Sequence, residues 1–282
     1  MDAPYHALQQ LEPGIARLLA PNPSAFTFTG TQTYVVGEAE VAIIDPGPHN
    51  AEHIDALVQA TAGRRVVAIM CTHTHRDHSP AAKPLADITG APIIGCAPLA
   101  LEDVGPRADA AFDGDYRPDR ILQDAESILA DGRKLTAVAT PGHTSNHLCF
   151  ADDASGALFT GDHVMAWSTT VVVPPDGDMA DYMASLAKLK TRADRIFYPA
   201  HGPAVTKPAQ LLRGMLGHRM QRERQILKIV GANPADIPSI VAQAYRGLDR
   251  RLVVAAGGSV WAHLLDLERR GLVVRKGEIW SA

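Results

Sequence analysis

Residues 65–78 read RVVAIMCTHTHRDH, an apolar run followed at once by three histidines and an aspartate. The run from Arg65 to Met70 predicts a short buried strand. The segment His73-Thr74-His75-Arg76-Asp77-His78 then lies in a loop after that strand. A loop can turn alternate side chains toward one point, and zinc accepts imidazole nitrogen and carboxylate oxygen as ligands. Taken alone, this spacing predicts either a metal-binding loop or a solvated surface loop.

Three further polar residues each follow a predicted strand and stand next to a glycine. They are His143 in TPGHT (140–144), Asp162 in FTGD (159–162) and His201 in YPAHG (198–202). Strand ends along one edge of a layered α/β fold are where sites are assembled, and glycine lets the backbone approach closely. We therefore expect these three side chains to meet the histidine loop at a metal site.

The surrounding pattern predicts antiparallel strands that give way to alternating helices and strands. β-Branched and aromatic residues alternate with turn formers at 26–29, 33–36 and 41–44, which predicts consecutive antiparallel strands. Periodicity then predicts helices over 50–61, 80–89 and 179–189, and strands over 92–95, 135–139, 148–151, 157–160 and 195–198. Residues 105–120 are polar and indicate a loop.

The chain changes character near Pro208. A long basic helix is predicted over 210–230, shorter helices over 238–245 and 258–270, and a tight hairpin over 272–280. This order is typical of a winged helix. We therefore predict a catalytic domain over residues 1–207 and a small winged-helix-like C-terminal domain over 208–282.

Charge divides unevenly between the two predicted parts. Residues 1–206 carry 25 acidic and 14 basic side chains, whereas residues 207–282 carry 6 acidic and 13 basic side chains. A basic module on an acidic body indicates a polyanionic partner, or else a solvated arginine-rich helix face. A third interpretation makes the C-terminal part a dimerisation lid over the pocket, so a homodimer is possible.

Composition restricts where the protein is expected to work. No apolar run approaches the roughly 20 residues of a membrane-spanning helix, and the N-terminus has no basic start followed by an apolar stretch. We therefore expect a cytoplasmic protein with no membrane partner. The cysteines, Cys71, Cys96 and Cys149, are odd in number and scattered, which suits a reducing compartment and argues against a metal-binding role.

The histidine loop and the later strand-end residues resemble the motifs of the metallo-β-lactamase superfamily, in the expected order from about residue 14 to residue 202. The resemblance implies an α/β fold of the αββα sandwich type and two bound metal ions. Zinc is expected from the ligand types, with manganese or iron as alternatives. By the resemblance, one ion is held by His73, His75 and His143, the other by Asp77, His78 and His201, and Asp162 bridges the two.

A narrower resemblance concerns the C-terminal part. A winged-helix-like tail directly after residues 200–203, together with WSTT at 167–170, resembles the β-lactamase-like protein 2 branch, which includes a single-strand-preferring endoribonuclease. His163 departs from that pattern, because a small uncharged residue is more usual directly after the bridging aspartate.

The expected chemistry is attack by water, since bound metal lowers the pKa of water toward about 7. Asp77 is predicted to accept a proton, and His163 either donates one to the leaving group or is simply packed. Ser168, Thr169 and Thr170 are candidates for substrate binding or for a strand running into residues 171–173. Two residues are expected to support the site: Asp45 behind a metal-binding histidine or as a turn former, and His147 as a residue that fixes its loop.

The metal-binding residues are compatible with phosphodiester, thioester, lactone and β-lactam substrates, so they do not identify the substrate. Lack of an export signal argues against antibiotic resistance, and the basic tail makes single-stranded RNA the leading substrate, with a small ester or thioester second. Aromatic content of 5% leaves few platforms for base stacking, which counts against RNA. Two other classes are a nucleic-acid-binding protein with a metal-sensing domain and an iron-dependent oxidase of sulfur compounds. The complete ligand set favours a hydrolase over both.

Overall fold

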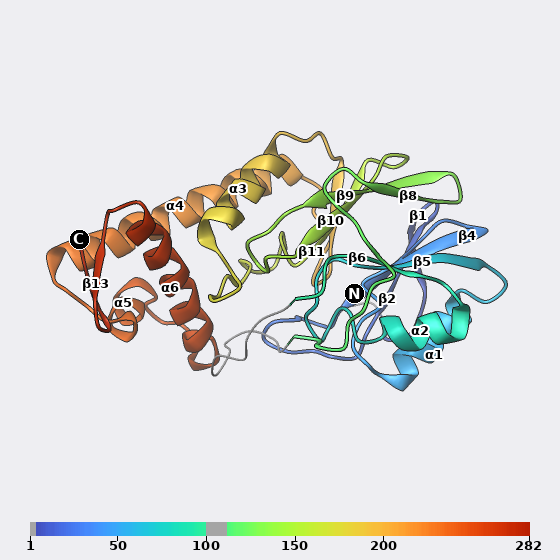
Figure 1. The fold of residues 1–282 in the computed structure, drawn as a ribbon, viewed down its shortest axis with the longest axis horizontal. Helices are drawn as coiled ribbons and strands as arrows, with labels where there is room; N and C mark the ends of the chain where they lie inside the picture. Colours follow the sequence, from blue (N-terminus) through green and yellow to red (C-terminus); the bar gives the residue numbers. More distant parts are fainter. Residues whose placement is uncertain (1–3, 100–111) are drawn as a thin grey trace.

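The structure is a computed structural model that describes residues 4–99 and 112–282 (Figure 1). Its first sheet holds seven strands in chain order: β1 (Gln9–Glu12), β2 (Ile15–Leu19), β3 (Gln32–Val36), β4 (Glu40–Ile44), β5 (Arg65–Cys71), β6 (Ile93–Gly95) and β7 (Arg120–Ile121). The first four strands pair antiparallel, and β4 to β7 pair parallel. Parallel neighbours need crossovers, which α1 (Ala51–Ala60) and α2 (Ala82–Thr89) supply.

The second sheet has the order β12 (Ile196–Pro199), β11 (Ala157–Gly161), β10 (Leu148–Asp152), β9 (Arg133–Ala139) and β8 (Ser127–Ala130). Only the β11–β12 pair of this sheet is parallel, and α3 (Met179–Lys190) connects its two strands. A hydrophobic cluster with members from both sheets, including Tyr34, Phe150 and Phe159, fills the space between them. The two packed sheets with outer helices confirm the predicted sandwich (Figure 1).

The C-terminal part contains α4 (Pro208–Ala232), α5 (Ile237–Ala244), the 3₁₀ turn η1 (Arg250–Leu252), α6 (Val253–Arg269), β13 (Val274–Lys276) and β14 (Ile279–Ser281). Three helices and a two-stranded wing confirm the winged-helix prediction. Helix α4 reaches from beside α3 to the far end of this part (Figure 1). Its Leu212 and Met215 belong to the cluster under α3, whereas Ile226 and Val230 belong to the C-terminal core. The predicted boundary at residue 207 therefore falls at the start of a helix that both cores share.

The strand predicted over residues 26–29 is wrong, because this segment forms turns. Ser24 Oγ accepts hydrogen bonds from the backbone N–H groups of Phe26 and Thr27, and Phe28 has a positive φ of 56°. Local side-chain bonds of this kind compete with sheet pairing. Of the polar stretch predicted over 105–120, residues 105–111 lie outside the described residues.

Among the described residues, no helix is both long and apolar enough to cross a membrane.

Candidate metal centre

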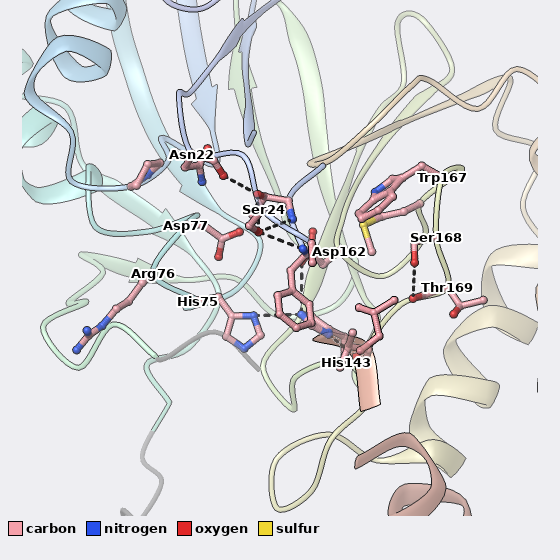
Figure 2. Close-up of a pocket in the computed structure, with 17 residues that line it drawn as sticks. Asn22, Ser24, His75, Arg76, Asp77, His143, Asp162, Trp167, Ser168 and Thr169 are labelled. Atoms are coloured by element: carbon pink, nitrogen blue, oxygen red, sulfur yellow. Dashed lines mark hydrogen bonds and ion pairs between the residues drawn. The ribbon is translucent and has the colours of Figure 1, made fainter. Parts of the chain in front are cut away.

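Four imidazole and carboxylate side chains converge in a first cluster, made of His73, His75, His143 and Asp162. The loop after β5 carries the first two, and the residues after β9 and β11 carry the others. His75 Nδ1 lies 3.0 Å from His73 Nε2 and 3.1 Å from His143 Nε2. Two nitrogens bound tetrahedrally to one zinc ion would lie about 3.3 Å apart. Figure 2 shows His75, His143 and Asp162 facing a common space.

The outward nitrogens of these rings fix which atom faces the cluster. His143 Nδ1 donates to the carbonyl oxygen of Val171 at 2.6 Å, so its Nε2 carries the lone pair. His73 Nδ1 lies 3.0 Å from Thr72 Oγ1, which itself donates to Asp45 Oδ2. Burial holds the pKa of His73 well below its usual range, so the ring is neutral. A neutral imidazole held by its outer nitrogen is oriented for metal binding.

A second cluster joins Asp77, His78 and His201. Asp77 Oδ2 lies 3.1 Å from His201 Nε2 and 3.4 Å from His78 Nε2. His201 Nδ1 donates to the carbonyl oxygen of Gly30 at 3.2 Å, and His78 Nδ1 donates to Asp45 Oδ2 at 3.0 Å. Both Nε2 atoms therefore point inward. The hydrogen bond to His78 confirms the prediction that Asp45 supports a histidine of the site.

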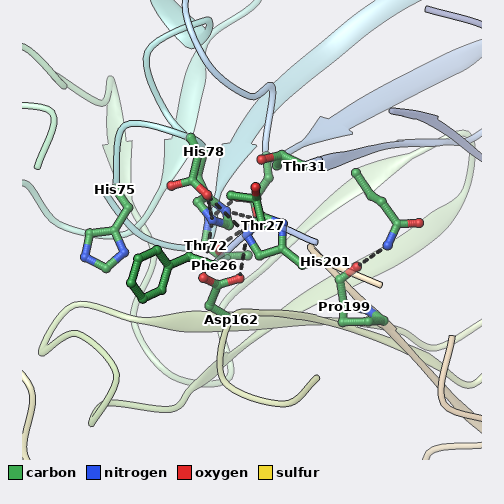
Figure 3. A network of polar contacts seen from close by, with 12 residues as sticks. Phe26, Thr27, Thr31, Thr72, His75, His78, Asp162, Pro199 and His201 are labelled. Atoms are coloured by element: carbon green, nitrogen blue, oxygen red, sulfur yellow. Dashed lines mark hydrogen bonds and ion pairs between the residues drawn. The ribbon is translucent and has the colours of Figure 1, made fainter. Parts of the chain in front are cut away.

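Asp162 stands between the two clusters (Figure 3). Its Oδ1 lies 3.2 Å from His201 Nε2, and its Oδ2 lies 3.6 Å from His78 Nε2 and 3.7 Å from His143 Nε2. Burial would raise the pKa of Asp162, but His201 and His78 hold it well below its usual range, so the carboxylate is ionised. Its position is the one that the bridging role implied by the family resemblance requires.

The nitrogen and oxygen atoms of the two clusters are arranged for metal coordination rather than for hydrogen bonds with one another. Within the described part of the chain, His78 Nε2, His201 Nε2, Asp77 Oδ1 and Asp162 Oδ1 are buried and make no hydrogen bond of good geometry, although the two nitrogens lie in ion-pair range of the carboxylates. Buried polar atoms are costly without a partner, and buried charges are usually paired or bound to metal. Nitrogen and oxygen donors in two such groups suit two zinc, manganese or iron ions.

Two local features place Asp162. Gly161 has φ of 48°, and a Cβ at this position would lie 2.7 Å from Thr72 Oγ1 and 2.8 Å from His147 Nε2. His147 Nε2 accepts the backbone N–H of Asp162 at 3.3 Å, and its Nδ1 lies 2.9 Å from Thr140 Oγ1. The glycine permits the close approach. His147 thus fixes its surroundings, as predicted.

Two of the predicted site residues point away from the substrate space. His163 is fully buried and packs edge-on against the ring of Tyr182 at 4.9 Å, and burial lowers its pKa to about 3. Thr170 is also buried, and its hydroxyl donates to the carbonyl oxygens of Asp162 and His163 at 2.8 and 3.1 Å. This geometry is against a proton-donor role for His163 and a substrate-binding role for Thr170. No strand forms over residues 171–173.

A pocket of about 330 Å³ opens beside the first cluster (Figure 2). Asp77 lines it, and so do Ser168 and Thr169, the two remaining candidates for substrate binding. Its other lining residues include several apolar side chains that sequence reasoning missed, namely Ala25, Phe26, Pro48, Met165, Trp167, Val171 and Leu252. Leu252 comes from the C-terminal part, so a pattern local to the catalytic half carries no signal for it.

A family model described as the metallo-beta-lactamase superfamily matches residues 26–201. The chain belongs to this superfamily. A second model, the beta-lactamase associated winged helix domain, matches residues 237–280. As a member of the superfamily with the HxHxDH-type site described above, the protein is a metal-binding hydrolase.

Similar proteins within the superfamily carry names that indicate different activities. A beta-lactamase-like protein 2 homolog of Caenorhabditis elegans is 32% identical over 227 residues, which is 79% of this chain and 73% of the relative. An atrochrysone carboxyl ACP thioesterase of Aspergillus chevalieri is 32% identical over 230 residues, covering 79% of this chain and 68% of the relative. The crystal structure of a beta-lactamase domain protein from Burkholderia ambifaria aligns with a TM-score of 0.82 at 20% identity, covering 99% of this chain and 95% of that chain.

Proposed function

We propose that the protein hydrolyses thioesters of carboxylic acids whose acyl group is apolar. The apolar pocket beside the metal centre carries this proposal. Phe26, Trp167 and Leu252 come from three separate segments of the chain and line the same space as His75 and Asp162. Each methylene of an acyl chain that enters such a space contributes about 0.8 kcal/mol. The similarity to a fungal carrier-protein thioesterase supports the same substrate class.

Two divalent ions, which we propose to be zinc, supply Lewis acidity and make a water molecule nucleophilic near neutral pH. The water oxygen forms a bond to the thioester carbonyl carbon, and the bond from that carbon to sulfur breaks. Asp77, which lines the pocket, accepts a proton from the water and returns it to the leaving thiolate or to solvent. The products are a carboxylic acid and a thiol.

The leaving group explains why no separate proton donor is needed. Among the described residues that line the pocket, the histidines are His75 and His143, and both belong to the metal cluster. A thiol has a pKa of about 8.5, so a thiolate leaves without prior protonation. An alkoxide released from a phosphodiester is far more basic and depends more strongly on a proton donor.

Single-stranded RNA, the leading substrate expected from the sequence, receives less support from the charges of the C-terminal part. Several of its basic groups are engaged within the fold. Arg222 stacks over Tyr245 at 3.7 Å, and Arg269 lies 2.8 Å from Asp178. Arg270 pairs with Glu223. Engaged guanidinium groups have less capacity to neutralise phosphates.

The test compares thioesters that share one thiol and differ in acyl length. We expect kcat/KM to rise about 4-fold per methylene until the pocket is filled, since 0.8 kcal/mol corresponds to that factor. A chelator and the His75→Ala variant should abolish the activity. Labelled single-stranded RNA is assayed with the same preparations. RNA cleavage without thioester hydrolysis by metal-loaded protein would refute the proposal.

A substitution at Leu252 provides a second, independent test of the proposed acyl pocket. Leu252→Trp fills the end of the pocket that the C-terminal part provides. Displacing about two methylenes should lower kcat/KM for long acyl groups about 15-fold, with little change for acetyl. Val254→Ala is the matched control, because Val254 is 67% exposed and is not a lining residue.

A further inference from the structure

We propose that Arg219 of α4 is a positioning residue for the metal centre. It anchors the two-residue segment Thr170–Val171, and that segment in turn fixes Asp162 and His143. The inference concerns metal binding, so it does not depend on which substrate the enzyme hydrolyses.

The Arg219 side chain is buried, with 3% of its surface exposed. Its Nη2 donates to the carbonyl oxygen of Thr170, and its guanidinium lies 5.1 Å from the centre of the Tyr182 ring. Tyr182 belongs to the same region, because its hydroxyl donates to the carbonyl oxygen of His163 at 3.2 Å. A buried guanidinium is costly unless it is hydrogen-bonded, so its direct bond to Thr170 is the informative feature.

The anchored segment contacts one residue after β11 and one residue after β9. Thr170 Oγ1 donates to the carbonyl oxygen of Asp162 at 2.8 Å. The next residue, Val171, accepts the Nδ1–H of His143 at 2.6 Å. Both contacted residues belong to the first cluster, and Asp162 also reaches His201 of the second. A shift of Thr170–Val171 would therefore move two donor side chains together.

Val172, directly after the segment, is buried in the cluster under α3, so packing holds the segment on one side and hydrogen bonds must fix its exact position. Residues 169–173 form neither helix nor strand, so no ladder of backbone hydrogen bonds fixes them. The attachment of α4 does not require an arginine, because Leu212 and Met215 on the same helix already pack in the hydrophobic cluster under α3. The direction of the Arg219 hydrogen bond, toward the Thr170 carbonyl, thus points to a positioning role.

The experiment measures metal affinity in the full-length protein by competition with a chromophoric chelator. Removing a group that orients a metal ligand typically costs about 10–100-fold in affinity. We expect Arg219→Met and Thr170→Val to weaken the retention of metal at least about 10-fold. Thr170→Ser keeps the hydroxyl and should restore wild-type affinity. The visible spectrum of the cobalt-substituted protein should change in the first two variants, because the ligand arrangement around the ion changes.

Met215→Ala is the matched control, since it removes buried packing one turn before Arg219 on the same helix and leaves the hydrogen bond from Arg219 to Thr170 in place. It should lower the melting temperature and leave metal affinity and the cobalt spectrum unchanged. If Arg219→Met does not fold, Arg219→Gln replaces it, because Thr170→Val and Thr170→Ser test only the link from the segment to Asp162 and leave the bond from Arg219 to the Thr170 carbonyl intact. The proposal is overturned if the folded Arg219 variant or Thr170→Val binds metal as tightly as wild type, or if Met215→Ala weakens metal binding as much as the Arg219 variant does.

Discussion

Replacing Asp45 by asparagine should weaken metal binding without removing any metal ligand. Asp45 is buried, with 1% of its surface exposed, and its carboxylate accepts three hydrogen bonds. Oδ1 accepts the backbone N–H of Thr72 at 2.8 Å, and Oδ2 accepts the Thr72 hydroxyl at 2.8 Å and His78 Nδ1 at 3.0 Å. In Asp45→Asn one carboxylate oxygen becomes an NH₂ group, which then faces donors.

The size of the effect follows from these contacts. A hydrogen bond to a charged group contributes about 1.5–3 kcal/mol. Loss of the partner that orients a metal-bound histidine typically lowers metal affinity about 10–100-fold, which is about 1.4–2.8 kcal/mol. The two estimates agree, so we expect a loss of about 10–100-fold for the ion that His78 holds.

Competitive titration of metal-free protein with zinc and a chromophoric chelator measures this loss. Asp152→Asn is the control, because Asp152 is equally buried and is bonded to Arg133 and Ser155 at the far end of β10. The control should lose stability and keep its metal affinity. Equal zinc affinity in Asp45→Asn and wild type, with both ions bound, would show that the His78 contact does not orient the ligand.

Three other predictions concern stability. Burial lowers the pKa of His263 from its usual 6.5 to about 3, so the unfolded chain binds a proton that the folded chain does not as the pH falls below 6.5. The free energy of unfolding should therefore fall by about 2 kcal/mol near pH 5. Urea unfolding of metal-free protein measures this fall, which His263→Leu should not show. Equal acid sensitivity of wild type and His263→Leu would contradict the prediction. Gly142→Ala should cost about 1–3 kcal/mol in thermal unfolding, because its Cβ would lie 2.3 Å from the Tyr182 backbone at a φ of 131°; an unchanged melting temperature would contradict the clash. Removing metal should lower the melting temperature, since a site at 100-fold excess of free ion over Kd contributes about 2.7 kcal/mol; calorimetry with and without chelator measures it, and identical curves would argue against bound metal.

The metal centre is readable from the sequence because its residues occupy short segments with characteristic spacing. His73 and His75 stand two positions apart, and His143 and Asp162 each follow a strand and a glycine. Chain order and periodicity likewise predicted the winged helix, whereas the sandwich was expected from the family resemblance that these motifs carry. These signals are local, and the structure brings the segments together at one edge of the two sheets.

The residues that sequence reasoning missed depend on contacts across long stretches of chain. Arg219 contacts Thr170, which lies 49 positions earlier in the chain, and the sequence around either residue contains no motif that indicates the contact. Leu252 lines the pocket because the C-terminal part folds back so that η1 lies beside the catalytic domain. The strand predicted at 26–29 is wrong for a local reason. Ser24 Oγ accepts the backbone N–H of Thr27, and this hydrogen bond favours a turn although the alternation of residues is typical of a strand.

Helix α4 also has a consequence for the order in which the protein matures. Synthesis starts at the N-terminus, so both sheets and α3 leave the ribosome before residues 208–232 do. Until then, the side of α3 that receives Leu212 and Met215 stays exposed to water. The nascent catalytic half therefore carries an uncovered apolar surface that its own next segment closes, and a released chain that ends near residue 207 would present that surface to chaperones.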